Sequence, residues 1–211
     1  MLGSAESPSR IRMSTTTGPD SRTTAISLPN LLTYGRIAAV PVIAGLVYWG
    51  TPLGNWLALA LFVLAAVTDF LDGYLARAMN QHSSLGRMLD PIADKLLVGV
   101  LLLVLAAVGR IGDWSLIPAA VILSREILVS GLREFLAGLQ VSVPVTWLAK
   151  WKTTLQLIAL GFLVVGPAGD QILPPTTLIG LSGLWISGIV TLYTGYEYFR
   201  GGLRHLIGEP S

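Results

Sequence analysis

The sequence predicts an all-α membrane protein with six transmembrane helices, and three observations lead to this class. Hydrophobic residues make up 53% of the 211-residue chain and charged residues only 12%, which is outside the usual range of soluble domains. Apolar stretches near the length of a spanning helix recur six times. Thirteen of the fourteen Lys and Arg residues fall on one side of the resulting topology, and only Arg110 falls on the other.

The six apolar stretches are separated by turn-forming residues. Clusters rich in Gly, Pro or Asp at residues 50–54, 109–113 and 166–170 follow the first, third and fifth stretches. The first stretch is short, and we expect its helix to begin earlier, near Leu31. In chain order, the expected spans cover residues 37–49, 55–76, 88–109, 114–136, 147–165 and 175–199.

The charge bias and the even number of spans place both termini in the cytoplasm. Residues 1–26 are rich in Ser, Thr, Gly and Pro, and we expect a disordered N-terminal tail there. Residues 27–205 form the predicted membrane domain, and residues 206–211 a short C-terminal tail. We expect no nucleic-acid partner.

Four aspartates interrupt this apolar chain near the cytoplasmic ends of the second and third spans. Asp69 and Asp72 are three residues apart, and Asp90 and Asp94 are four apart, so each pair lies on one helical face. Carboxylates at this depth are costly unless they are paired, hydrated or bound to a cation. The chain has no Cys and only two His, so oxygen ligands for Mg²⁺ or Mn²⁺ are the best fit, with two ions plausible.

Other residues around the aspartates have two readings when each is taken alone. Gly73 and Gly86 suit helix packing as well as a close ligand approach, and Arg77 suits a cytoplasmic anchor as well as a phosphate contact. Together with the aspartates they form the pattern Asp69-x2-Asp72-Gly73-x2-Ala76-Arg77-x8-Gly86-x3-Asp90-x3-Asp94. This pattern resembles the signature of the CDP-alcohol phosphatidyltransferase family at every position.

The resemblance implies a six-helix membrane enzyme, usually a homodimer, that transfers a phosphatidyl or phosphoalcohol group from a CDP-linked donor to an alcohol and releases CMP. It implies two divalent cations held mainly by Asp69, Asp72 and Asp90. Asp94 would then be the catalytic base, in contact with one cation as well. Residues implied in donor binding are Gly73, Ala76, Arg77 and Gly86, together with Asn30 and Thr33 on a segment expected along the membrane surface, where a structural role is equally plausible.

Basic residues at the cytoplasmic ends of the fourth and fifth spans are candidates for the acceptor site. Arg125 lies deep in its span, where an arginine is costly unless it meets a carboxylate such as Glu126 or a phosphate. Lys150 and Lys152 have an alternative reading as interfacial anchors. The implied acceptor-phosphate residues are Arg125, Arg133, Lys150 and Lys152.

Longer segments, from Leu28 to the end of the sixth span, resemble the bacterial members of the family that use CDP-diacylglycerol and glycerol 3-phosphate. This implies formation of phosphatidylglycerophosphate in the inner membrane, with the active site facing the cytoplasm. Two enzymatic alternatives use another acceptor: phosphatidylglycerol in a cardiolipin synthase, or an inositol phosphate in a phosphatidylinositol phosphate synthase. An ion transporter is a more distant alternative, because buried Asp and Arg also mark ion pathways.

Overall fold

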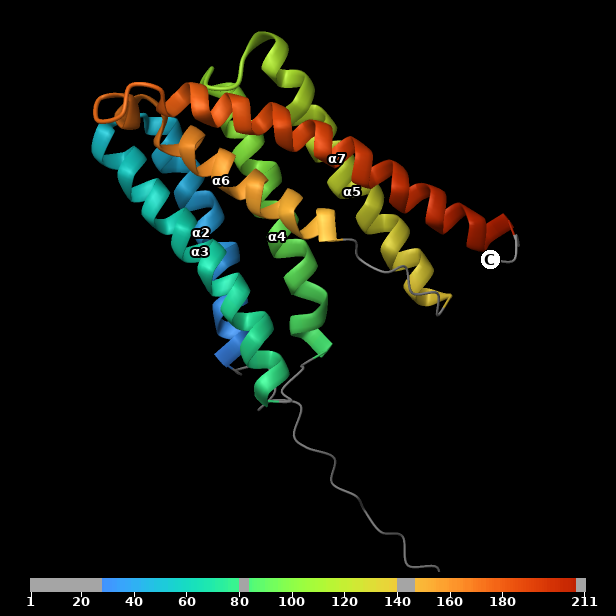
Figure 1. The fold of residues 1–211 in the computed structure, drawn as a ribbon. Coiled ribbons are helices and arrows are strands. Elements are labelled where there is room, and N and C mark those ends of the chain that lie inside the picture. Colours follow the sequence, from blue (N-terminus) through green and yellow to red (C-terminus); the bar gives the residue numbers. More distant parts are fainter. Residues whose placement is uncertain (1–27, 80–83, 140–146, 208–211) are drawn as a thin grey trace, which may run out of the picture.

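The structure, a computed structural model, describes residues 28–79, 84–139 and 147–207. Within these residues the secondary structure is helical and no β-strand occurs, which confirms the all-α class. Six long helices and one short 3-10 helix follow one another (Figure 1). Their bounds are α2 Leu28–Trp49, α3 Pro52–Met79, α4 Ser84–Ala107, η1 Asp113–Ser115, α5 Leu116–Gly138, α6 Trp147–Asp170 and α7 Thr176–Ile207.

Five of the long helices in the described part are long and apolar enough to cross a membrane: α2, α3, α5, α6 and α7. The remaining one, α4, has 24 residues. At 1.5 Å per residue such a helix is about 36 Å long, which is enough for the hydrocarbon core. α4 is thus long enough to cross the membrane but is not among the five helices that are also apolar enough, so a total of six spans stays a prediction. Large apolar side chains such as Trp49, Leu103 and Leu178 are exposed on the helix surfaces, where lipid would cover them.

The helices pack in an order that differs from their order in the chain. α2 packs against α3 and α4, α3 packs against α6, and α7 lies between α6 and α5 (Figure 1). The hydrophobic core forms where α2, α3, α4 and α6 meet, around the buried side chains of Ile43, Phe62, Leu101 and Leu160. This core fixes the relative positions of the three helices that carry the aspartate site.

Small residues allow α7 to approach its neighbours closely. A Cβ atom added at Gly180 would lie 2.8 Å from Cγ of Leu163, and one added at Gly183 would lie 2.9 Å from Cβ of Ala159. Both contacts are shorter than real Cβ atoms tolerate, so these positions require glycine at the present helix separation. The α6–α7 pair is thereby held in one antiparallel register.

Turns form at the predicted glycine clusters, with one difference. Gly50 and Gly109 have positive φ angles of 69° and 72°, which glycine adopts at little cost. Gly166 also leaves the helical region, with φ 44° and ψ −123°, but the helical path resumes at Pro167 and continues to Asp170. The expectation that the fifth span ends in a turn over 166–170 is therefore only partly right.

Two further expectations differ from the structure. The segment containing Asn30 and Thr33 is not a separate surface element, because both residues lie in the first turns of the continuous helix α2. The last helix runs to Ile207, so it includes the first two residues of the expected C-terminal tail. The predicted N-terminal tail, residues 1–26, lies outside the described residues.

Candidate active site

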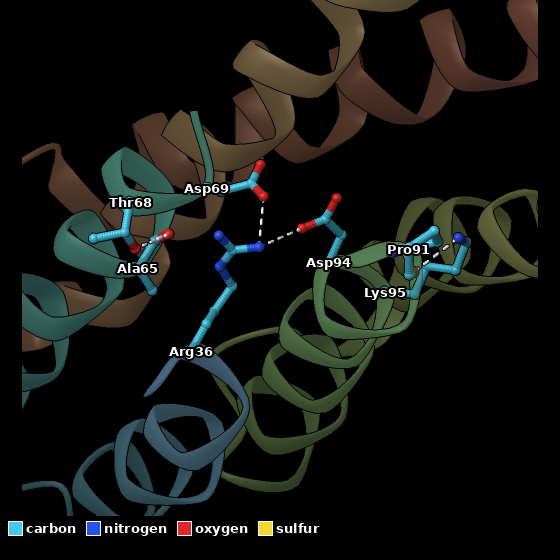
Figure 2. A network of polar contacts seen from close by, with 7 residues as sticks. All are labelled: Arg36, Ala65, Thr68, Asp69, Pro91, Asp94 and Lys95. Atoms are coloured by element: carbon cyan, nitrogen blue, oxygen red, sulfur yellow. Dashed lines mark hydrogen bonds and ion pairs between the residues drawn. The ribbon is translucent and has the colours of Figure 1, made fainter. Parts of the chain in front are cut away.

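The candidate site lies at the end of the molecule where α2 begins, α3 ends and α4 begins (Figure 1). Asp69 comes from the second half of α3, and Asp94 from the first half of α4. Their carboxylates meet the same guanidinium group, that of Arg36 on α2 (Figure 2). The prediction that the aspartates of the second and third spans face each other is confirmed for this pair.

Arg36 approaches the two carboxylates from the buried side. Its Nη1 donates hydrogen bonds to Oδ1 of Asp69 at 2.5 Å and to Oδ1 of Asp94 at 3.2 Å. The Arg36 side chain is only 1% exposed, whereas those of Asp69 and Asp94 are 44% and 52% exposed. In Figure 2 the second oxygen of each carboxylate points away from Arg36. A ligand can therefore reach the aspartates without displacing the arginine side chain from its packing.

Neighbouring polar groups bond to their own helices. The Nζ of Lys95 donates to the carbonyl of Pro91 at 2.9 Å, and the hydroxyl of Thr68 donates to the carbonyl of Ala65 at 3.0 Å (Figure 2). Lys95 follows Asp94 directly in the chain, but in Figure 2 its ammonium group points away from the aspartate pair. Arg36 thus supplies the positive charge between the two carboxylates.

The two predicted donor-binding residues of α2 lie on the same helical face as Arg36. Asn30, Thr33 and Arg36 are spaced by three residues, and all three are buried. A buried polar stripe at the start of a membrane helix is costly unless it meets polar partners. The structure therefore brings Asn30 and Thr33 to the side of α2 that leads to the aspartates.

The rest of the signature lies within α3 and α4, but its side chains fall outside the described part of the structure. This applies to Asp72, Gly73, Ala76, Arg77, Gly86 and Asp90. Among the described side chains no group of three or more potential metal ligands occurs, so the four-carboxylate cluster stays a prediction. The described pair does fit a cation site, because two carboxylate oxygens from different helices already share one cationic nitrogen.

A second polar cluster joins α5, α6 and α7. The Nζ of Lys152 donates to Oε1 of Glu126, and Nη1 of Arg125 lies 3.5 Å from the same oxygen. The Lys152 side chain is 3% exposed and that of Arg125 is 15% exposed. Arg125 packs closely against α7, since a Cβ atom at Gly195 would lie 3.1 Å from its Cγ. Two of the predicted acceptor residues, Arg125 and Lys152, therefore share one carboxylate.

Arg133 lies two turns after Arg125 on α5 and contacts α7. Its Nε donates to the hydroxyl of Tyr198 at 3.3 Å, and its guanidinium carbon lies 5.6 Å from the centre of the Tyr198 ring. The side chain of Lys150, the fourth predicted acceptor residue, lies outside the described residues. The sequence analysis missed Tyr198, because an aromatic residue on an apolar helix carries no signal until its neighbour is known.

Unpaired polar atoms continue this cluster into the α6–α7 interface. Gln156, one turn after Lys152, is buried, and its Oε1 has no hydrogen-bond partner within the described part of the chain. The same holds for Nε of Arg125 and Oγ1 of Thr191. A buried polar atom without a partner costs about 1–3 kcal/mol. Groups of this kind beside three basic residues are typical of a site that takes up a polar ligand or water.

Arg110, the basic residue predicted on the opposite side of the membrane, has a structural role. Pro167 lacks an N–H, so the carbonyl of Leu163 loses its usual helical donor. Nη1 of Arg110 donates to this carbonyl at 3.1 Å and to that of Val164 at 2.5 Å, while Nη2 donates to Oδ1 of Asn55 at 2.7 Å. Burial lowers the pKa of Arg110, which nevertheless stays charged at neutral pH. Arg110 thus stabilises the break in α6 and ties it to α3.

An apolar groove of about 610 Å³ runs between α3 and α6. Phe62 and Val67 line it from α3, and Ile158 and Gly161 line it from α6. Val67 is the lining residue of α3 closest in the chain to Asp69, but the two side chains lie about 200° apart around the helix, so the groove and the carboxylate occupy different faces of α3. Its lining suits an extended hydrocarbon chain.

Comparison with known proteins adds to this geometry. Residues 26–193 match the model of a protein family described as CDP-alcohol phosphatidyltransferase. A protein of Rickettsia bellii named CDP-diacylglycerol--glycerol-3-phosphate 3-phosphatidyltransferase is 52% identical over 174 residues, which cover 82% of this chain and 94% of that protein.

More distant relatives carry the same name. One from Cereibacter sphaeroides is 39% identical over 217 residues, covering 87% of this chain and 98% of the relative. One from Pectobacterium atrosepticum is 38% identical over 186 residues, with the same coverage of both chains.

Proposed function

Because the chain belongs to the CDP-alcohol phosphatidyltransferase family, we propose that it transfers the phosphatidyl group of CDP-diacylglycerol to glycerol 3-phosphate. The products are phosphatidylglycerophosphate and CMP. The relatives named for this reaction are similar over nearly their whole length, up to 52% identity. The observation that carries the proposal is the meeting of Asp69 and Asp94 at one cationic nitrogen, with a basic cluster on the neighbouring helices.

Asp69 is proposed to bind the divalent cation together with Asp72 and Asp90. The partly exposed Asp69 carboxylate is held by Arg36 through one oxygen, and its other oxygen points outward (Figure 2). When bound, Mg²⁺ or Mn²⁺ supplies positive charge to the donor diphosphate and to the departing CMP. The groove between α3 and α6 is proposed to take an acyl chain of the donor, since its lining is apolar and it runs along α3, the helix that carries Asp69.

Asp94 is proposed to accept the proton of the attacking hydroxyl. In this step the sn-1 hydroxyl oxygen of glycerol 3-phosphate forms a bond to the phosphatidyl phosphorus, and the bond from that phosphorus to CMP breaks. The exposure of Asp94, 52%, lets an acceptor from the cytoplasm reach it. The alignment of Asp94 with the attacking hydroxyl has to supply much of the effect.

The phosphate of the acceptor is proposed to bind at the cluster of α5 and α6. Arg125, Arg133 and Lys152 provide three positive charges and Glu126 one negative charge, an excess of two that matches a phosphate dianion. Before the acceptor phosphate binds, Glu126 orients Arg125 and Lys152, and Tyr198 orients Arg133. Lys150 is proposed to add to this cluster from the first turn of α6.

We place the enzyme in the bacterial inner membrane with the aspartates facing the cytoplasm. Support comes from the five helices that are long and apolar enough to span, and from the gathering of thirteen basic residues on one side. A homodimer is proposed from the family resemblance, and the exposed apolar side chains of the helices are compatible with one.

The proposal is tested with purified protein in lipid vesicles. CMP release is measured with CDP-diacylglycerol, with and without glycerol 3-phosphate, and with Mg²⁺ or a chelator. Release that needs donor, acceptor and Mg²⁺ together supports the proposal. Ion flux across the vesicles without any CMP release would favour the transporter alternative instead.

A further inference from the structure

We propose that Arg36 is a positioning residue that holds Asp69 and Asp94 together and competes with the divalent cation for their charge. This inference rests on the proposed function, and it assigns a role to a residue outside the aspartate signature. Arg36 stands on a different helix from the signature, 33 residues before Asp69 and 58 before Asp94.

The buried position of Arg36 requires that its charge be compensated. Arg36 is 2% exposed as a residue and lies in a helix that is long and apolar enough to span a membrane. An arginine in this environment is costly unless its charge is compensated. Asp69 and Asp94 provide the compensation, and both remain open to ligands on their other side.

The hydrogen bonds of Arg36 couple two helices. One nitrogen, Nη1, bonds Oδ1 of both carboxylates, so the positions of α3 and α4 relative to each other are coupled at this atom (Figure 2). Without Arg36, two like charges would face each other across the helix pair and separate. The second oxygens stay available for a cation, and Asp94 is kept at a fixed place for the acceptor hydroxyl.

Electrostatics gives the sign of the effect on metal binding. A guanidinium beside a divalent cation repels it, and in a partly buried site this repulsion is strong. Loss of Arg36 also frees two aspartate side chains, but the entropy of two short side chains is a smaller contribution. A variant without the charge should therefore bind the cation more tightly while it turns over more slowly.

The experiment compares the unsubstituted protein with Arg36→Gln and Arg36→Lys. Mn²⁺ binding is measured directly by calorimetry or by electron paramagnetic resonance, and melting temperature is measured in chelator and in saturating Mn²⁺. We expect Arg36→Gln to bind Mn²⁺ about tenfold or more tightly and to lose more than tenfold in kcat. Its melting temperature should fall in chelator and recover in Mn²⁺, because the cation replaces the missing charge. Arg36→Lys should keep the Mn²⁺ affinity and regain part of the turnover.

Arg110→Gln is the matched control, since Arg110 is another arginine whose hydrogen bonds join helices, but it is only half-buried and lies at the opposite end. Its melting temperature should fall equally with and without Mn²⁺, and its Mn²⁺ affinity should not change. Unchanged or weaker Mn²⁺ binding by Arg36→Gln, or a loss of stability that Mn²⁺ does not restore, would overturn the inference. If Arg36→Gln does not fold, the test uses Arg36→Lys. A fall in both the Mn²⁺ affinity and the turnover of Arg36→Lys would overturn the proposed role of Arg36. If the unsubstituted protein does not bind Mn²⁺, the proposed metal site itself is wrong. This outcome differs from the outcomes above, which concern only the Arg36 variants.

Discussion

The substitution Lys152→Met probes the proposed acceptor site most cleanly. Methionine keeps the length and apolar stem of the side chain but removes its ammonium group. Glu126 loses one partner and retains Arg125, whose Nη1 lies 3.5 Å from the shared oxygen. The protein should therefore fold, since neither an unpaired buried carboxylate nor a cavity is created.

The size of the effect follows from the burial of Lys152. With 3% exposure, its bond to a bound phosphate is shielded from water, and a hydrogen bond to a charged group in such a place contributes about 1.5–3 kcal/mol. At about 1.4 kcal/mol per factor of ten, kcat/KM for glycerol 3-phosphate should fall roughly 10- to 150-fold. Because the phosphate does not react, the loss should appear mainly as a higher KM for the acceptor.

The two constants are obtained from initial rates of CMP release. Glycerol 3-phosphate is first varied at saturating CDP-diacylglycerol, and CDP-diacylglycerol is then varied at saturating glycerol 3-phosphate. Arg200→Gln is the control for a change of surface charge, because Arg200 is exposed near the end of α7 and outside the cluster. Equal losses for donor and acceptor, or an unchanged KM for glycerol 3-phosphate, would refute the reasoning.

Three further predictions concern the base, the clamp at the opposite end and the helix packing. Asp94→Asn should abolish turnover and keep donor and metal binding, and a loss of donor binding as large as that of Asp69→Asn would make Asp94 chiefly a ligand. Arg110→Gln should lower the free energy of unfolding by about 2 kcal/mol, since it removes charged donors from the α6 break, and a denaturant titration that shows no change would contradict this. Gly180→Ala should lower the melting temperature, because the new Cβ would lie 2.8 Å from an α6 side chain. Gly131→Ala should not lower it, because the space around Gly131 is open. Equal melting temperatures for the two variants would contradict the role of Gly180 in helix packing.

Local patterns in the sequence were sufficient for the helices and for the aspartate pair. Apolar runs bounded by glycine clusters predicted each long helix, because length and composition decide whether a segment can span. The spacing of Asp69 and Asp94 within their helices, with a short connection between them, predicted that they would meet. Both features depend on residues near one another in the chain.

Features that depend on distant contacts were not predicted. Arg36 was counted only among the cytoplasmic basic residues, since nothing near it in the chain shows that α2 packs between α3 and α4. The continuation of α6 beyond Gly166 was missed for the same reason. Arg110, more than fifty residues away, supplies the hydrogen bonds that the break and Pro167 remove.

The central claim is the identity of the reaction, and product analysis tests it most directly. Purified protein in vesicles with CDP-diacylglycerol and Mg²⁺ is offered glycerol 3-phosphate, phosphatidylglycerol or an inositol phosphate, and the lipids formed are identified by mass. We expect phosphatidylglycerophosphate, in equal amount to the CMP released, from glycerol 3-phosphate alone. A lipid product from another alcohol, with none from glycerol 3-phosphate, would contradict it.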